Sequence, residues 1–401
     1  MKPDFAFVES LYRGLPQEAR QAVDQAVGAV VRARRGGGRV VVVTGSGPNV
    51  HEGVTTLLAE LLRIGLVQGI STSSAVVAHE MAGALDRVHR VQGRRLGLSE
   101  ALLPKGGLFE VTLLTDSELE VLAGELALDL DLVRRARALP GEAIIKAAGN
   151  MAYPMGLRTE RLALEVAALA RERGLPFEHV AGLGADPRTM IGAAAEARAP
   201  VLVSVPQLVG GGTVGLAIGD SMPISRRSEL MAELLAGAEV IIESGVALTQ
   251  EVHDGPFETY TGHGIWASWE GKRTYSLKGK TLVRIDLDPV LAQVWELERS
   301  GAQVQRSIDR GLPKTKTFQV PFRMEMSGFA RLEGSIPIVA DLGLVWPVLA
   351  WRAAKELGLE LGFLSYPQES EQGRRMREWI VENVAFLDRK RMLKRLRELE
   401  P

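Results

Sequence analysis

Apolar runs alternate with amphipathic stretches along most of the chain, which is the pattern of a sheet with helices packed on it. Short runs of β-branched and other apolar residues predict buried strands at 40–44, 66–70, 143–148, 201–205, 239–243, 281–285 and 336–340. Apolar residues three and four positions apart predict helices at 51–64, 75–85, 116–133, 159–173, 185–197, 228–235, 291–297 and 345–357. Strands that alternate with helices predict an α/β fold built on a parallel sheet.

The two ends of the chain differ from this middle part. Residues 17–35 mix alanine and valine with charge and end in a glycine triplet. We expect an N-terminal helical arm at 1–38, an α/β domain at 39–365 and a charged helical tail at 366–401.

The segment from Arg39 to Leu85 contains a strand, a turn of small residues, a helix, a second strand and a second polar turn. Glycines in such turns let a ligand approach the backbone and permit positive φ angles. The following helix N-terminus offers N–H groups to a phosphate. The candidate cofactor-binding residues are Gly45, Ser46, Gly47, Asn49, Thr72, Ser73 and Ser74. An ordinary turn with capping hydroxyls explains the same residues, and both interpretations stay open.

Two further features follow predicted strands. The triplet Gly210-Gly211-Gly212 comes after the strand at 201–205 and suits close approach of the backbone to a ligand, or a flexible turn. Asp341 ends the strand at 336–340. Its carboxylate is a candidate for ribose binding, and capping of the next helix is the alternative.

The polar segment 249–264 supplies candidates for chemistry. His253, Asp254 and His263 form a candidate proton-transfer group because histidine titrates near neutrality. Lys272 is a candidate nucleophile, since burial beside aromatic residues such as Trp269 would keep its amine neutral. A surface lysine in a glycine-containing loop is the alternative.

His79 and Glu80 lie on the helix that follows the second turn. We consider His79 as an acid or base and Glu80, with Asp254 and Trp269, as a substrate-binding residue. A solvated polar pair is the alternative. We assign no metal, because the histidines lack the close spacing of a metal site.

Composition limits the class of protein. The chain has 401 residues, of which 46% are hydrophobic and 24% charged, and a formal net charge of -1. The charge argues against nucleic-acid binding, and no run is long and apolar enough for a membrane span. There is no cysteine, which excludes disulfides and thiolate chemistry. We expect a globular protein of the cytoplasm.

Several of these segments, in this order, resemble deoxyhypusine synthase and its bacterial homologues. The turn at 45–49 and the segment 72–75 resemble the two turns of the family's opening unit. Gly210-Gly211-Gly212 resembles the triple glycine beneath the dinucleotide, and residues 231–243 and 336–349 resemble later helix and strand pairs. The resemblance implies a three-layer Rossmann-like parallel sheet with helices on both faces, NAD as cofactor, and a homotetramer with active sites between subunits.

The sequence also departs from the family pattern. His79-Glu80 stands where the synthases have a pair of acids, and residues 214–217 replace a histidine pair. The family's catalytic lysine belongs to a Trp-Gly-Lys motif before the C-terminal strand. If that strand is 336–341, no lysine matches; if it is 281–286, Lys272 matches with one inserted residue. The first placement is preferred because it also accounts for residues 336–349.

The resemblance therefore implies an NAD-dependent transferase that acts on a small amine or polyamine-like substrate through a dehydrogenated imine. Two alternatives remain. One is a hydrolase or lyase that uses His253, Asp254 and His263 without a dinucleotide. The other is a non-catalytic homologue that has kept the fold.

Overall fold

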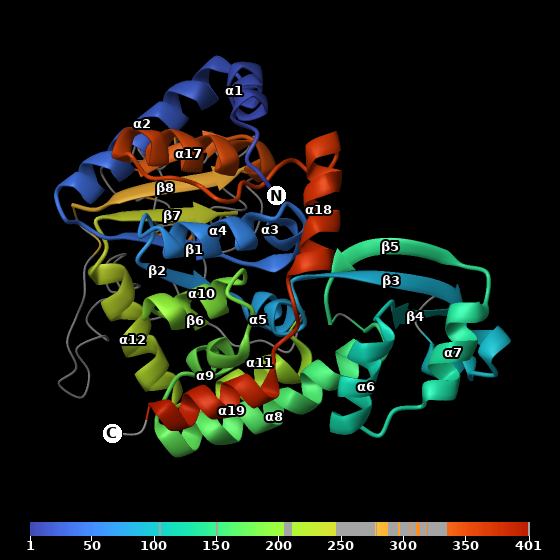
Figure 1. The fold of residues 1–401 in the computed structure, drawn as a ribbon. Helices are drawn as coiled ribbons and strands as arrows, with labels where there is room; N and C mark the ends of the chain where they lie inside the picture. The colour runs from blue at the N-terminus through green and yellow to red at the C-terminus, as the bar shows by residue number, and fades with distance from the viewer. Residues whose placement is uncertain are drawn as a thin grey trace.

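The structure is a computed structural model that describes residues 1–103, 106–149, 151–203, 211–245, 277, 279–287, 296, 306, 310–312, 319 and 335–399. Its centre is a sheet of six strands (Figure 1). These are β1 (Val40–Thr44), β2 (Gly69–Thr72), β6 (Val201–Val203), β7 (Val240–Ser244), β8 (Thr281–Asp286) and β9 (Ser335–Val339). Every neighbouring pair is parallel.

The order of these strands is β6-β2-β1-β7-β8-β9, which is 3-2-1-4-5-6 when the strands are numbered along the chain. This is the order of the doubly wound dinucleotide-binding fold, in which the winding direction reverses beside the first strand. Here the reversal lies between β1 and β7. The predicted α/β fold class, a parallel sheet with helices on both faces, is confirmed.

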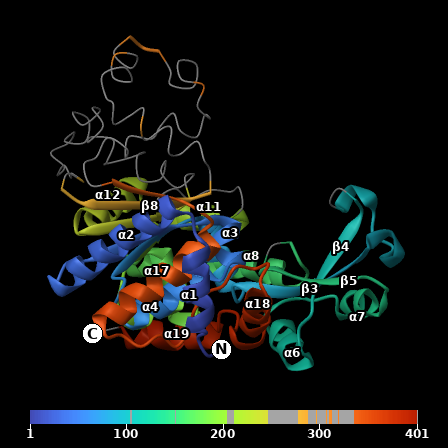
Figure 2. The same cartoon turned by 90° about the horizontal axis from the view of Figure 1, so that it is seen from above.

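Helices cover both faces because the central strands bury both sets of side chains. Val40 and Val42 belong to the larger core, and Val41 and Val43 to a second core on the opposite face. The larger core is formed by α2 (Gln17–Arg35), α4 (Val54–Arg63), α5 (Ser74–Met81), α8 (Met155–Arg173), α9 (Phe177–Gly184), α10 (Met190–Ala197), α11 (Gly212–Ser221) and α17 (Leu342–Leu357). The second core is closed by α12 (Ile224–Ala236). Figure 2 shows α4 and α17 on the opposite side of the sheet from α12.

Both terminal segments pack on this α/β unit. α1 (Phe5–Gly14) and α2 lie against α17. α18 (Glu371–Asn383) buries Met376 and Ile380, and α19 (Arg389–Glu398) buries Met392 and Leu396. Among the described helices none is both long and apolar enough to cross a bilayer.

A second, antiparallel sheet projects to one side of the parallel sheet (Figures 1 and 2). It has the order β4-β3-β5, with β3 (Leu85–Gln92), β4 (Leu108–Thr112) and β5 (Glu142–Ala147). The 3-10 turns η1 (Gly93–Leu96) and η2 (Glu100–Leu102), with α6 (Asp116–Glu125) and α7 (Leu130–Ala138), complete this unit. α18 buries Met376 and Ile380 in the larger core and also contacts this second sheet, since Arg377 Nη2 donates to Ile145 O at 2.5 Å and Arg87 pairs with Glu378.

Several predicted boundaries are wrong. The helix expected at 51–64 is two helices, α3 (Ser46–His51) and α4, separated by Gly53 at φ 69°. The helix expected at 75–85 ends at Met81, because Gly83 and Ala84 adopt positive φ angles of 99° and 66°. The strand expected at 66–70 is β2, which begins at Gly69. The strand expected at 143–148 exists as β5 but belongs to the antiparallel sheet.

Candidate functional site

The carboxyl ends of parallel strands share one edge of the sheet, and ligands of doubly wound folds bind there, at the point of reversal. The turn at 45–49 follows β1, the turn at 72–74 follows β2, and Gly211-Gly212 begins α11 after β6. All three candidate turns therefore lie at the same edge. This edge is the candidate site.

A chain of buried hydrogen bonds crosses the reversal point. Trp346 Nε1 donates to Ser244 Oγ at 2.9 Å, and Ser244 Oγ donates to Asn49 Oδ1 at 2.5 Å. Asn49 Nδ2 in turn donates to Gly45 O at 2.7 Å. Trp346, Ser244 and Asn49 are each at most 2% exposed. The chain fixes the turn after β1 to the end of β7 and to α17, and it gives Asn49 a structural role.

The turn after β1 is helical almost from its start. Gly45 is extended at φ -168°, and Gly47 lies within α3. The expected positive φ angles at Gly45 and Gly47 are therefore wrong, because α3 begins at once and needs none. Gly212, by contrast, has a φ of 55°, and a Cβ there would lie 2.9 Å from Glu160 Oε1. Gly212 is the position at this edge where the backbone itself requires glycine.

Two buried hydroxyl groups lie side by side at this edge. Val43 pairs with Ser71, so Thr44 and Thr72 are the next neighbours on the two strands and face the same side of the sheet. Both side chains are 0% exposed, and neither hydroxyl has a hydrogen-bond partner within the described part of the chain. Buried polar groups in proteins are nearly always hydrogen-bonded, so these two hydroxyls, with Ser71 Oγ on the same strand as Thr72, need a partner that the described residues do not supply.

Two other candidate residues at this edge have a structural role, because they cap helices. Ser73 is the N-cap of α5, and its Oγ accepts from Val76 N at 3.4 Å. Asp341 is the N-cap of α17, and its Oδ1 accepts from Gly343 N at 2.6 Å. Ser74 is buried in the first turn of α5, and Ser46 opens α3.

His79 and Glu80 are buried within the fold. The Glu80 carboxylate accepts from Met190 N at 2.8 Å and from Ile191 N at 3.0 Å, which caps α10. Burial raises the pKa of Glu80 to about 8, against the effect of these two bonds. His79 Nδ1 donates to Ala148 O at 2.7 Å, and burial lowers its pKa. The structure thus gives both residues contacts within the protein core.

A group of ionisable residues missed in the sequence lies beside α3. Burial raises the pKa of Glu52 to about 7, although Gln368 N donates to its Oε2 at 2.8 Å; Asp341 raises the pKa further. Burial lowers the pKa of His51, and the charge of Arg377 lowers it further. Such perturbed groups are frequent at functional sites, and in buried ion networks too. No local pattern in the sequence marks this group, since Gln368 and Arg377 are distant from α3 along the chain.

Six of the predicted site residues lie outside the described residues: Gly210, His253, Asp254, His263, Trp269 and Lys272. By sequence, Gly210 follows β6 and the other five follow β7. Among the described residues, no group of three or more histidine, aspartate or glutamate side chains is placed to hold a metal ion.

Comparison with known proteins gives a distant likeness of fold. No protein-family model matches the sequence, and no curated protein matches it. Similar solved structures include AgrE in a ternary complex with ornithine and NAD+, with 16% identity and a TM-score of 0.39 over 85% of this chain and 34% of that chain. ArgZ, an arginine dihydrolase of the cyanobacterial ornithine–ammonia cycle, has 13% identity and a TM-score of 0.38 over 85% and 32%.

A LOR/SDH protein from Methanococcus maripaludis S2 has 10% identity and a TM-score of 0.37 over 89% of this chain and 70% of that chain. The chain spans about a third of the length of AgrE and of ArgZ. At these scores and identities the likeness carries no argument about family, substrate or activity.

Proposed function

We propose that the protein binds NAD across the carboxyl ends of β2, β1 and β7 and uses it to dehydrogenate a small amine. The observation that carries this proposal is the pair of buried hydroxyls of Thr44 and Thr72, which have no partner among the described residues, beside the reversal point of a doubly wound sheet. Backbone N–H groups at the start of α3 and at Gly211-Gly212 would face the phosphates, and the two hydroxyls would hydrogen-bond to ribose or phosphate oxygens.

The residues fit this cofactor with two departures from the usual fingerprint. Val50, 1% exposed, stands where the third glycine of G-x-G-x-x-G would be. β2 ends in Ser71-Thr72 and has no acid for the ribose 2′-hydroxyl. An acid at this position selects NAD over NADP, so we expect the two dinucleotides to bind with similar affinity.

Bound NAD would supply a hydride acceptor, so that a carbon carrying an amine becomes an imine. Lys272 is the candidate to add to the imine carbon, and the original carbon–nitrogen bond would then break so that the substrate nitrogen leaves as an amine. His253 and His263 are the candidates to take the proton from the lysine and to give one to the leaving nitrogen. Asp254 and Trp269 are the candidates to hold the cationic amine and its apolar part. The proposal does not use His79 and Glu80, because both are hydrogen-bonded in the core.

We further propose that the active form is a homotetramer, as the resemblance to deoxyhypusine synthase implies. Light scattering on the protein as it elutes from a size-exclusion column would give the mass of the oligomer directly. A stable monomer with full NAD affinity would contradict this part of the proposal and leave the dinucleotide site standing.

Calorimetric titration with NAD tests the site. Thr72→Val and Thr44→Val remove one hydroxyl each and keep the shape of the side chain. Loss of one hydrogen bond is worth about 0.5–1.5 kcal/mol, so each variant should bind NAD roughly two- to tenfold more weakly.

Thr55→Val is the matched control. Thr55 is also 0% exposed, and its hydroxyl has no partner among the described residues, but it lies within α4. It should fold like the other two variants and keep the parent affinity. No NAD binding by the parent protein, or equal affinity in all three variants, would refute the proposal.

A further inference from the structure

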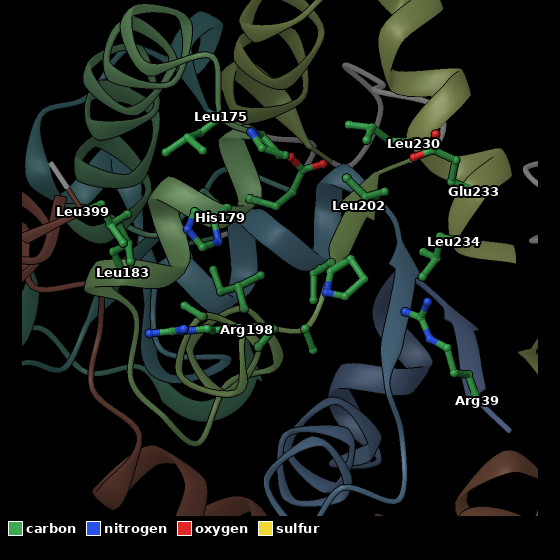
Figure 3. A pocket seen from close by; sticks show the side chains of 18 residues that line it. Arg39, Leu175, His179, Leu183, Arg198, Leu202, Leu230, Glu233, Leu234 and Leu399 are labelled. Carbon is green, nitrogen blue, oxygen red and sulfur yellow. The ribbon is translucent and has the colours of Figure 1, made fainter. Parts of the chain in front are cut away.

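A cavity of about 570 Å³ lies beside β6, the last strand at one side of the parallel sheet (Figure 3). It is lined by Pro200, just before β6, and by Arg39, just before β1, so it opens at the amino edge of the strands. The candidate dinucleotide site is at the opposite edge. The volume falls within the roughly 300–1,000 Å³ of small-molecule sites.

Most of the cavity wall is apolar. Leu175, Leu183, Leu202, Leu230 and Leu234 are among the lining residues, and Figure 3 shows them around the opening together with His179. An apolar wall with a few polar groups is the usual composition of a ligand pocket. The polar groups therefore decide what the pocket accepts.

One polar group at the inner wall lacks a partner in the part of the chain that the structure describes. Arg227 Nη1 donates to Glu178 Oε1 at 2.5 Å and to Val203 O at 3.0 Å, and Val203 N donates to Glu178 Oε1 at 2.6 Å. This ion pair closes the open side of β6 at Val203. Glu178 lines the cavity and is 1% exposed, and its Oε2 has no hydrogen-bond partner among the described residues.

The open side of β6 offers a second acceptor. Pro200 O accepts from Ile70 N at 2.9 Å, so Pro200 faces β2. In a parallel ladder alternate residues face opposite sides, and Val201 therefore presents its N–H and C=O away from β2, as Val203 does. Val201 also lines the cavity. The inner wall thus holds two acceptors, Val201 O and Glu178 Oε2, and a small movement of the buried Glu178 side chain would bring Oε2 to the N–H group of a ligand.

Charged side chains of both signs line the outer parts of the cavity, and Glu233 lies beside Leu230 and Leu234 (Figure 3). Arg198 and Arg39 line the cavity on opposite sides (Figure 3), and Arg198 is exposed. The imidazole of His179 lies on the same side of the cavity as Arg198 (Figure 3), and burial lowers its pKa, which favours the neutral form. The Glu178 charge is already matched by Arg227, which favours a neutral N–H donor over an ammonium group at the inner wall.

We propose that this cavity binds a small aromatic heterocycle with a ring N–H directed at Glu178 and Val201 and a carboxylate directed at Arg198. The apolar ring would lie among the leucines. An indole carboxylate has this combination of groups. The site is independent of the proposed dinucleotide site.

Three probes separate the contributions, each titrated calorimetrically into the full chain. Indole-3-acetate has the ring, the N–H and the carboxylate. 1-Naphthaleneacetate keeps the ring size and the charge but lacks the N–H, and we expect it to bind about tenfold more weakly. 3-Methylindole lacks the carboxylate and should bind severalfold more weakly. Equal affinity for indole-3-acetate and 1-naphthaleneacetate, or no binding of indole-3-acetate, would overturn the proposal.

Two variants test whether indole-3-acetate binds in this cavity. Ala195 lines the cavity and is partly exposed, so Ala195→Phe fills it from the side. This variant should bind indole-3-acetate at least tenfold more weakly and keep the parent affinity for NAD. Indole-3-acetate binding that survives in this variant would refute the location.

Arg198→Gly is the second variant and does not depend on filling the core. Arg198 has a φ of 51°, which glycine adopts without strain, so the variant should fold at least as well as the parent. Arg198→Gly should bind indole-3-acetate severalfold more weakly and keep the parent affinity for 3-methylindole. Arg95→Ala, an exposed arginine of the second sheet unit, is the control for net charge and should change neither. Equal effects of the two arginine variants would contradict the proposal.

Discussion

Ser244→Ala removes the central hydroxyl of the hydrogen-bond chain at the reversal point. Trp346 Nε1 loses its acceptor, and Asn49 Oδ1 loses its donor from Ser244. Both side chains are at most 2% exposed, so neither reaches bulk water. A buried polar group without a partner costs about 1–3 kcal/mol. Two such groups should lower the free energy of unfolding by about 2–6 kcal/mol.

Ser365→Ala is the matched control for this substitution. Ser365 is 0% exposed and Ser244 is 1% exposed, so both serines are buried. Unlike Ser244, Ser365 has a hydroxyl with no hydrogen-bond partner among the described residues. Removing an unpartnered hydroxyl relieves its desolvation cost and removes one atom from the packing. We expect a change in the free energy of unfolding of less than about 1 kcal/mol in either direction.

Urea denaturation followed by far-UV circular dichroism would compare the two variants through their midpoints at unchanged slope. Ser244→Ala should also weaken the binding of NAD, because the turn at 45–49 loses its shorter hydrogen bond to β7 and keeps only the bond from Asn49 Nδ2 to Ser244 O at 3.4 Å. Ser365→Ala should leave NAD affinity unchanged. Equal stabilities of the two variants, within about 0.5 kcal/mol, would refute the structural role of the chain.

Further predictions follow from other buried contacts. The folded pKa of Glu80 is about 8, above the unfolded value, so the native state binds more protons and stability should fall as pH rises from about 4.5 to 8. Glu80→Gln should reduce the difference in the free energy of unfolding between pH 5 and pH 8, taken from denaturation curves, by about 2–4 kcal/mol. A difference equal to that of the parent protein would contradict this prediction. Arg227→Met leaves the Glu178 carboxylate buried and unpaired and should cost about 3–5 kcal/mol, measured by urea unfolding, whereas adding Glu178→Leu should recover part of the loss. Gly212→Ala forces a Cβ onto a φ of 55° and should lower stability by about 1–2 kcal/mol without changing the helix content.

The parallel sheet could be predicted because a strand that is buried on both faces consists of consecutive apolar residues, as Val40 to Val43 do. Such a run is visible in the sequence itself. The antiparallel sheet could not be predicted in this way. In β3 the buried apolar residues Leu85, Val88 and Val91 are three positions apart, which is closer to helical spacing than to the alternation of a strand. Pairing with β4 and β5 decides the structure of this segment.

The site could be predicted in position but not in detail. The turns after β1 and β2 lie at one edge because parallel strands end together, which the strand pattern implies. The partners of Asn49 could not be predicted, since Ser244 and Trp346 lie far along the chain and are brought to it by the fold. The same holds for Glu80, whose partners Met190 and Ile191 lie 110 and 111 residues away.

Amide hydrogen exchange of the full chain with and without saturating NAD reports where the dinucleotide lies on the sheet. We expect slower exchange in peptides covering residues 44–49, 72–76 and 211–215, and unchanged exchange in peptides around residues 198–202. Protection confined to the amino edge of the sheet, or exchange that NAD leaves unchanged throughout, would contradict the proposed dinucleotide site.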